Sequence, residues 1–202
     1  APKGNYDVRV RKAGDVININ RLNYKGIVGD LSGTGQIQLA SKKHPLTWQI
    51  DARTNGLLPK KYRSDLPLER LTGHINARGR MLNISKNRVK GQRHIISFTN
   101  TDLKANLDAS QDSRTIGITG SGDASVDIIG GELSVFDARF DGHIDTADVP
   151  KGSLSIDAAG TPKLIRIRKL YYNGEAGAVK ANGVIDLRQN IGWTVDGRFD
   201  KF

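Results

Sequence analysis

The chain of 202 residues contains no cysteine, a single methionine, two tryptophans and only six prolines. Without cysteine it can form neither a disulfide scaffold nor a thiolate metal site, and the redox compartment stays open. No apolar run approaches the roughly 18 residues that a membrane-spanning helix needs, so we expect this piece to be soluble or peripheral to a membrane. No signal peptide opens it. Its start at Ala1 and its end within a strand-like pattern lead us to expect an excerpt of a longer protein.

Residue patterns typical of catalysis or metal binding are missing as well. None of the four histidines lies at metal-ligand spacing with another histidine or a carboxylate: His44, His74, His94 and His143. The glycine pairs in residues 33–35 and 120–122 lack the third glycine and the following helix of a dinucleotide-binding motif. Asp137 and Asp141 have no neighbouring nucleophile or apolar pocket that would support acid–base catalysis. We therefore predict no catalytic residue, no metal and no cofactor, and hence no enzyme.

Basic residues outnumber acidic residues by 31 to 21, which gives a formal net charge of +10. The densest basic stretch runs from Arg78 to Arg93. It lacks the interleaved aromatic residues on which single-stranded nucleic acids stack, and no nucleic-acid-binding signature accompanies it. We interpret it as a solvated strand face with loops, with attraction to phosphate head groups as an alternative. We predict no nucleic-acid partner.

Apolar and polar residues alternate with a period of two along almost the whole chain. In residues 164–168, for example, Ile165 and Ile167 share one face of a strand while Arg166 and Arg168 share the other. Half-buried antiparallel strands have this pattern, whereas buried parallel strands are apolar throughout. Many of the 23 glycines fall where short turns are expected. We predict an all-β protein of about 14 to 16 strands joined by hairpin-length loops.

Two segments of the chain, residues 15–53 and 163–199, repeat one another. The residues that recur at a constant offset of 148 are Ile17, Ile19, Leu22, Tyr24, Gly26, Gly29, Gly35, Ile37 and Leu39. Trp48 returns as Trp193 after a loop that is three residues shorter. In both copies the alternation changes parity once, after Ile19 and after Ile167, which predicts a β-bulge or a tight bend. Apolar strand positions and turn glycines repeat, so the repeat describes an extendable surface rather than a catalytic site.

The segment 56–71 breaks the alternation. Its Ser64-Asp65 start, its prolines and its leucine spacing allow one or two helical turns. We predict a loop or short helix that closes one edge of the sheet, and the alternative is a segment that lines or gates the apolar face.

Three architectures could bury the apolar face of so many strands. A sandwich would cover it with a second sheet. A β-solenoid adhesin would stack coils of about 20–30 residues. A long antiparallel sheet that curls on itself would leave an apolar trough. The apolar area of this trough would be far larger than the few hundred Å² that a soluble monomer normally exposes. We favour the curled sheet over residues 1–202 as a single segment. Unlike a sandwich it is lengthened by adding strands, the long repeat unit does not fit the short coils of a solenoid, and the trough would accept lipid acyl chains.

The two tryptophan-containing units carry a family resemblance. Residues 31–39 with 46–51, their second copy at 179–187 with 191–196, and the proline-leucine stretch 66–79 together resemble the TamB family, the inner-membrane-anchored subunits of the translocation and assembly module of Gram-negative bacteria. AsmA-like proteins and bridge-type lipid transfer proteins share the architecture. The resemblance covers about half of the chain, since 84–150 matches only in strand pattern.

The resemblance implies a taco-shaped sheet in the periplasm that moves phospholipids toward the outer membrane and supports outer-membrane protein assembly, autotransporter secretion included. It also implies an outer-membrane barrel partner of the TamA type, bound through regions outside this fragment. It carries no catalytic residue. In a lipid-conducting mechanism, acyl chains would contact the following residues: Ile17, Ile19, Ile37, Leu39, Trp48, Ile50, Ile165, Ile167, Ile185, Leu187, Trp193 and Val195. In the alternative, a chaperone-like mechanism, free strand edges would shelter a nascent outer-membrane strand by β-augmentation.

Overall fold

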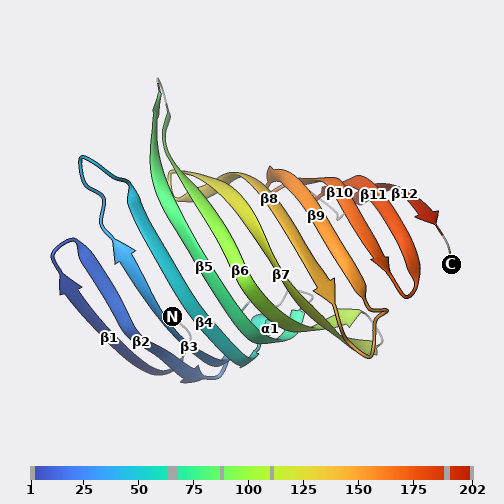
Figure 1. The fold of residues 1–202 in the computed structure, drawn as a ribbon, viewed down its shortest axis with the longest axis horizontal. Helices are drawn as coiled ribbons and strands as arrows, with labels where there is room; N and C mark the ends of the chain where they lie inside the picture. The colour runs from blue at the N-terminus through green and yellow to red at the C-terminus, as the bar shows by residue number, and fades with distance from the viewer. Residues whose placement is uncertain (1–2, 63–67, 87–88, 110–111, 189–191, 201–202) are drawn as a thin grey trace.

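The computed structural model describes residues 3–62, 68–86, 89–109, 112–188 and 192–200. These residues form one sheet of 12 antiparallel strands, in which neighbours in space are neighbours in sequence (Figure 1). The strands are β1 (Gly4–Ala13), β2 (Val16–Gly26), β3 (Gly29–Gln38), β4 (Leu46–Leu57), β5 (Leu68–Lys86), β6 (Val89–Ala109), β7 (Asp112–Ile129), β8 (Glu132–Ile144), β9 (Gly152–Thr161), β10 (Leu164–Gly174), β11 (Gly177–Asp186) and β12 (Gly192–Asp200).

The predicted all-β curled sheet is confirmed, while two rival architectures are wrong for the described residues. A solenoid stacks parallel strands, yet every pairing here is antiparallel. A sandwich needs a second sheet, and the described strands belong to one. The predicted strand number was too high because β5, β6 and β7 are 19, 21 and 18 residues long.

The short helix predicted within 56–71 is α1 (Pro59–Tyr62). It follows the end of β4, where the Leu58 amide donates a hydrogen bond to the carbonyl oxygen of Val28 at 2.8 Å. This contact attaches the segment to the β2–β3 turn, and Val28 is buried there. The predicted Ser64-Asp65 start lies outside the described residues. The segment therefore lies at the ends of the strands, beside a turn.

The apolar side chains lie on one face of this single layer. Opposite residues of an antiparallel pair share a face, so the pairing of Ile17 with Ile37 and of Ile37 with Trp48 places all three together. Along β3, Leu31 and Ile37 of this face are partly buried, whereas Ser32 and Gln36 of the other face are exposed. The described strands form no second sheet over the apolar face, so its partial burial comes from neighbouring side chains and the curvature of this sheet.

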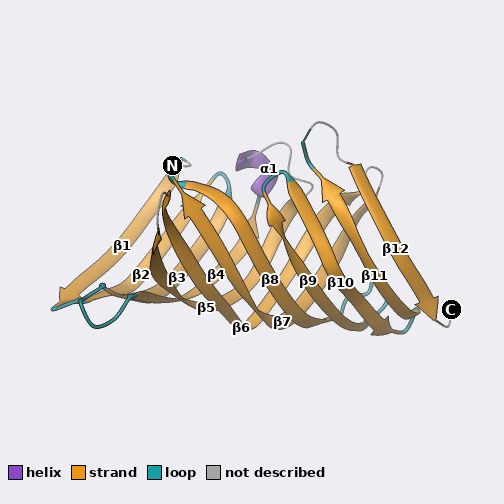
Figure 2. Ribbon diagram, turned by 90° about the horizontal axis from the view of Figure 1, so that it is seen from above, coloured by secondary structure: helices purple, strands orange, loops and turns teal. Residues whose placement is uncertain are grey.

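The sheet is strongly twisted along its length. Figure 2 shows β1 and β12, the two edge strands, sloping in opposite directions. Register shifts also interrupt three strands near their middle, between Ile19 and Leu22 in β2, between Phe98 and Thr101 in β6, and between Ile167 and Leu170 in β10. Such bulges bend a strand and increase its twist. The predicted parity changes after Ile19 and Ile167 are thus confirmed as bulges.

The repeat recurs in the structure beyond the residues that reveal it in sequence. β1, β2 and β3 begin and end 148 residues before β9, β10 and β11. The Leu39 and Leu187 amides donate to the carbonyls of Asp15 and Lys163, both at 2.8 Å. The Tyr24 hydroxyl donates to the Lys3 carbonyl at 3.1 Å, and Tyr172 donates to the Lys151 carbonyl at 3.0 Å. The repeating structural unit therefore starts before residue 15, with β1 and β9.

Glycines on the apolar face permit the bend beside the β2 bulge. Gly33 and Gly35 lie opposite Leu22 and Ile19 on β2. A Cβ atom at Gly33 would lie 2.7 Å from the Asp51 carbonyl oxygen, and one at Gly35 would lie 2.8 Å from the Gln49 carbonyl oxygen. Both distances are shorter than van der Waals contact, so a side chain at either position would push β3 and β4 apart.

We expect Gly35→Val to destabilise the sheet by about 1–3 kcal/mol, the usual cost of overpacking. Thr34→Val is the matched control because Thr34 is the adjacent residue of β3, is exposed on the other face, and accepts a β-branched side chain. Urea denaturation followed by circular dichroism measures both. Equal stabilities of the two variants would contradict this account of the bend.

Candidate functional site

All twelve residues predicted to contact acyl chains lie on the apolar face. In the first repeat Ile17, Ile37 and Trp48 lie opposite one another, and Ile19 is joined to Ile50 through Gly35. In the second repeat Ile165, Ile185 and Trp193 lie opposite one another, and Ile167 is joined to Val195 through Gly183. Leu39 and Leu187 follow the ends of β3 and β11 with the same parity.

A row of apolar residues connects the two repeats without interruption. Taken from β1 to β12, the residues opposite one another are Val10, Ile19, Gly35, Ile50, Ala77, Phe98, Gly122, Phe140, Ile156, Leu170, Ala181 and Gly197. We call this set the apolar row. At about 4.8 Å between strands it extends on the order of 50 Å.

A second row runs beside it from β2 to β12 and contains no polar side chain either. It comprises Ile17, Ile37, Trp48, Gly79, Ile96, Ala124, Ala138, Ala158, Ile167, Gly183 and Val195. Alanine and glycine occupy much of the centre of this row, so side chains project least from the sheet in the middle of the face. The two rows together present apolar atoms across the full width of the sheet.

Aromatic rings lie over glycines on this face. A Cβ atom at Gly79 would lie 2.6 Å from the Trp48 indole, and one at Gly120 or Gly142 would lie 2.6 Å from the Phe140 ring. The rings therefore lie along the sheet instead of standing upright from it. This arrangement leaves the space above the face open.

The apolar face is not sealed by any other part of the described chain. Tyr24, Val28 and Ala77 are the buried hydrophobic residues, and no large side chain is fully buried. Near the two edges of the sheet exposure is greater: Val10 is 55% exposed and Trp193 is 73% exposed. Interdigitation with a partner layer, which would have excluded a hydrophobic guest, is therefore absent among the described residues.

Residues of the central strands were missed by sequence reasoning. Phe98, Phe140 and Ile156 lie in the apolar row but belong to neither predicted repeat. Each occupies an alternating position, and this alternation could have indicated that the residue lies on the apolar face. However, adjacent apolar residues such as Ile95 and Ile96 hide which of the two faces the apolar one is. The pairing that joins β6 to β7 also links residues that are distant in sequence.

Ion pairs organise the opposite, polar face. The Arg168 guanidinium contacts Asp137 on β8 at 2.6 Å and also binds Asp157 on β9. Arg93 on β6 binds Asp127 on β7 at 2.7 Å. Hydrogen bonds from Arg168 lower the pKa of the Asp137 carboxyl below its ordinary value. Asp137 is therefore held as an ionised partner of Arg168.

The histidine and carboxylate residues do not assemble a metal site in the described part of the chain, where no group of three or more candidate ligands occurs. His74 Nε2 lies 2.8 Å from Asp51 Oδ2, and Asn76 donates to the same oxygen at 3.3 Å. The hydrogen bond with His74 is the main cause that lowers the pKa of Asp51. This pair bridges β4 and β5 and acts as a cross-strand polar contact.

Surface hollows on the polar face are lined by hydrophilic side chains, for example Gln36, Gln49, Arg78 and Ser97. A twisted sheet is saddle-shaped, so each face is concave along one direction. These hollows are open to solvent, and their charged residues include both signs, as in the hollow lined by Lys180, Asp196 and Arg198. The candidate functional site is therefore the apolar face.

Comparison with protein-family models, with curated proteins and with solved structures found no match for this chain. None of the described helices is long or apolar enough to cross a membrane. The geometry of the apolar face is therefore the structural basis from which a function can be inferred.

We expect Arg168→Gln to raise the pKa of Asp137 toward its ordinary value, because the hydrogen bonds that lower it are lost. The lowered pKa means that the pair stabilises the fold above the ordinary carboxyl pKa and loses this effect as the pH falls through the lowered value. Carboxyl titration by nuclear magnetic resonance measures the shift. Arg166→Gln, also exposed on the polar face of β10, is the control. An unchanged Asp137 pKa in Arg168→Gln would refute the ion pair.

Proposed function

We propose that this chain is a segment of a periplasmic protein that conducts phospholipids between the inner and outer membranes and supports outer-membrane protein assembly. The acyl chains contact the apolar face and the head groups stay in water. The observation that carries the proposal is the apolar row, which crosses all 12 strands without a polar side chain.

The size of the apolar face supports a hydrophobic guest. Soluble monomers rarely expose contiguous apolar patches beyond a few hundred Å². A face on the order of 50 Å long and at least two rows wide exceeds that limit. Contact with a lipid acyl chain removes this surface from water at about 25 cal/mol per Å², and therefore favours occupancy over an empty face.

The composition of the row supports movement rather than storage. Apolar contact is non-directional, so an acyl chain gains similar stabilisation at each position along the rows. The described rows contain no charged side chain, and the indole N–H of Trp48 is their one side-chain hydrogen-bond donor, so few groups could hold a lipid at one place. A lipid can therefore slide from strand to strand.

The family resemblance supplies the cellular setting of the proposal. It places the segment in the periplasm, within a protein anchored in the inner membrane, and gives an outer-membrane barrel of the TamA type as partner of regions outside this chain. Catalysis has no part in the proposal.

A chaperone-like function is the second candidate, because both edge strands are open. Among the described strands, β1 pairs with β2 alone and β12 pairs with β11 alone. Exposed apolar residues, including Val8 and Val195, accompany these free edges. A nascent outer-membrane strand could add to either edge by β-augmentation. Crosslinks to protein instead of lipid would favour this candidate.

We expect Ile37→Asp and Ile185→Asp each to reduce lipid capture about ten-fold, because a carboxylate on the apolar face must be desolvated by the acyl chain. Native mass spectrometry of the purified chain after incubation with phospholipid vesicles measures the captured lipid. The matched controls are Thr34→Asp and Asn182→Asp, exposed polar-face positions on the same two strands. A wild-type chain that carries no lipid would refute the proposal.

A photo-reactive residue placed at position 37 or 185 should form lipid adducts in cells, since both positions lie on the apolar face. The same probe at position 166 lies on the polar face and should give few adducts. Lipid adducts from position 166 alone would contradict the proposed path of the acyl chains.

A further inference from the structure

The strand ends form two rims with different charge. Turns that follow odd-numbered strands lie on one rim, and turns that follow even-numbered strands lie on the other, because the sheet is an antiparallel meander. Exposed cations on the first rim are Arg11, Lys12, Lys42, Lys43 and Lys163, which we call the basic rim. The structure shows no ion pair for these side chains within the described residues.

The first two turns of the basic rim are joined to each other and well ordered by hydrogen bonds. The Leu39 amide donates to the Asp15 carbonyl at 2.8 Å, which holds the end of β3 against the β1–β2 turn. In the β3–β4 loop the Ser41 amide donates to the His44 carbonyl at 3.0 Å, and the Lys43 amide donates to Ser41 Oγ at 3.2 Å. Four cations thus lie at this end of the first strands: Arg11 and Lys12 in the last residues of β1, and Lys42 and Lys43 in the β3–β4 loop.

The other rim carries Lys3, Lys25 and Lys61 at its first strand ends, but acids accompany the cation of its later turns. Lys151 Nζ lies 2.6 Å from Asp145 Oδ1, and the Lys151 amide donates to Glu175 Oε2 at 3.2 Å. The acids of the first rim among the described residues are Asp15, Glu132 and Asp186. Asp186 is bound to Arg188, which lowers the pKa of Asp186 to about 2, so this acid is already neutralised by its partner.

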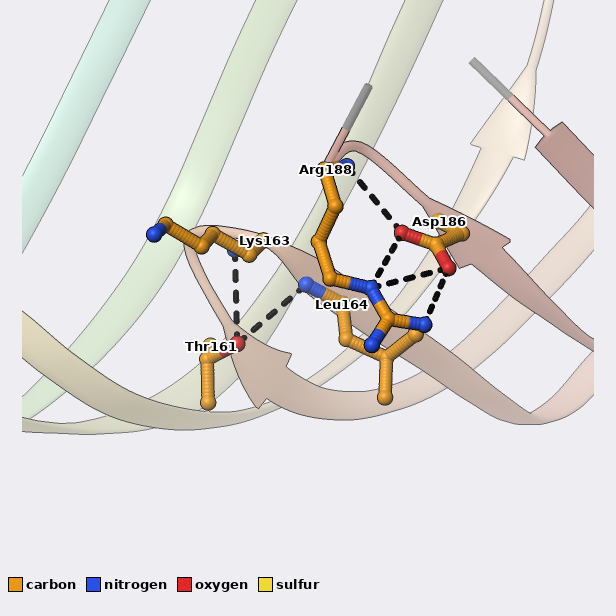
Figure 3. A network of polar contacts seen from close by, with 5 residues as sticks. All are labelled: Thr161, Lys163, Leu164, Asp186 and Arg188. Atoms are coloured by element: carbon orange, nitrogen blue, oxygen red, sulfur yellow. Dashed lines mark hydrogen bonds and ion pairs between the residues drawn. The ribbon is translucent and has the colours of Figure 1, made fainter. Parts of the chain in front are cut away.

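Figure 3 shows the same rim in the second repeat. Thr161 Oγ1 accepts hydrogen bonds from the amides of Lys163 and Leu164 at 3.3 and 3.2 Å. The Lys163 side chain is directed away from the Asp186–Arg188 pair. A cation with no ion pair among the described residues thus remains at the β9–β10 turn, six strand positions from the β3–β4 loop.

We propose that the lipid bound by the apolar face is an anionic phospholipid whose phosphate lies against the basic rim. This inference rests on the proposed function. Lys42 and Lys43 follow Leu39 by three and four residues, so their charges lie on the order of 10 Å from apolar side chains of the face. That separation matches the distance between the phosphate and the upper acyl chain of a lipid. Charges on the polar face, such as Arg166, project from the opposite side of the sheet and so cannot contact the phosphate of a lipid on the apolar face.

The test is competitive capture from vesicles that contain equal amounts of phosphatidylglycerol and phosphatidylcholine with identical acyl chains. After removal of the vesicles, native mass spectrometry gives the ratio of the two lipids on the protein. We expect at least about five-fold enrichment of phosphatidylglycerol at low salt, since basic residues near an anionic lipid surface attract it appreciably. The enrichment should fall at about 0.5 M salt through screening.

Variants locate the effect on the rim. The triple variant K12Q/K42Q/K43Q should reduce the enrichment toward unity and leave phosphatidylcholine capture unchanged. The control K3Q/K25Q/K61Q removes the same charge from exposed positions at the other strand ends and should keep the enrichment. Asp186→Asn should increase it, because Arg188 loses its ionised partner.

Each contrary result has a distinct meaning. Equal capture of both lipids overturns this inference and leaves lipid conduction standing, whereas capture of neither overturns both. If both triple variants lost the enrichment of phosphatidylglycerol equally, the preference would come from net charge. The proposed role of the basic rim would then be overturned. Binding of soluble glycerophosphate as strongly as the lipid would identify a free-phosphate site, and flotation with vesicles without captured lipid would identify adsorption to a bilayer; either outcome overturns the inference.

Discussion

Apolar side chains on a single-layered sheet can leave water only if the sheet bends around them or around a guest. This constraint governs the whole molecule, because among the described residues no second sheet exists and no large side chain is fully buried. Mid-strand bulges supply the bend, and glycines such as Gly33 give β3 and β4 room to approach each other. The same curvature that protects the face partially leaves it accessible along its length.

The two faces hold the sheet by different interactions. On the apolar face, aromatic rings such as Phe140 lie against glycine positions, and the two apolar rows contain no charged side chain. On the polar face, arginine–aspartate pairs such as Arg168 with Asp137 connect neighbouring strands. Exposed ion pairs of this kind contribute little stability individually, about 0–1 kcal/mol. Their regular spacing across strands instead favours one register, since a slip by one residue would move them to the other face.

Features that depend on residues close in sequence could be predicted, whereas features that depend on pairing between distant residues could not. Alternation and parity are local, so the strand faces, the bulges after Ile19 and Ile167, and the short helix before β5 could be predicted. Pairing is not local. Nothing near Phe98 in sequence indicates that Gly122 lies opposite it, so the apolar row across β6 to β9 was found only in the structure. The strand count failed because bulges within β5 and β6 look like strand ends in a sequence.

The offset of 148 residues between repeats has a consequence for how such a sheet could lengthen. β9 is the structural counterpart of β1, so one period spans eight strands, an even number. Strand direction is therefore conserved from period to period, and each type of turn returns to the same rim. Gain or loss of a complete hairpin preserves that arrangement. Gain or loss of one strand would reverse every later strand and exchange the charges of the two rims downstream, so growth of the sheet is restricted to pairs of strands.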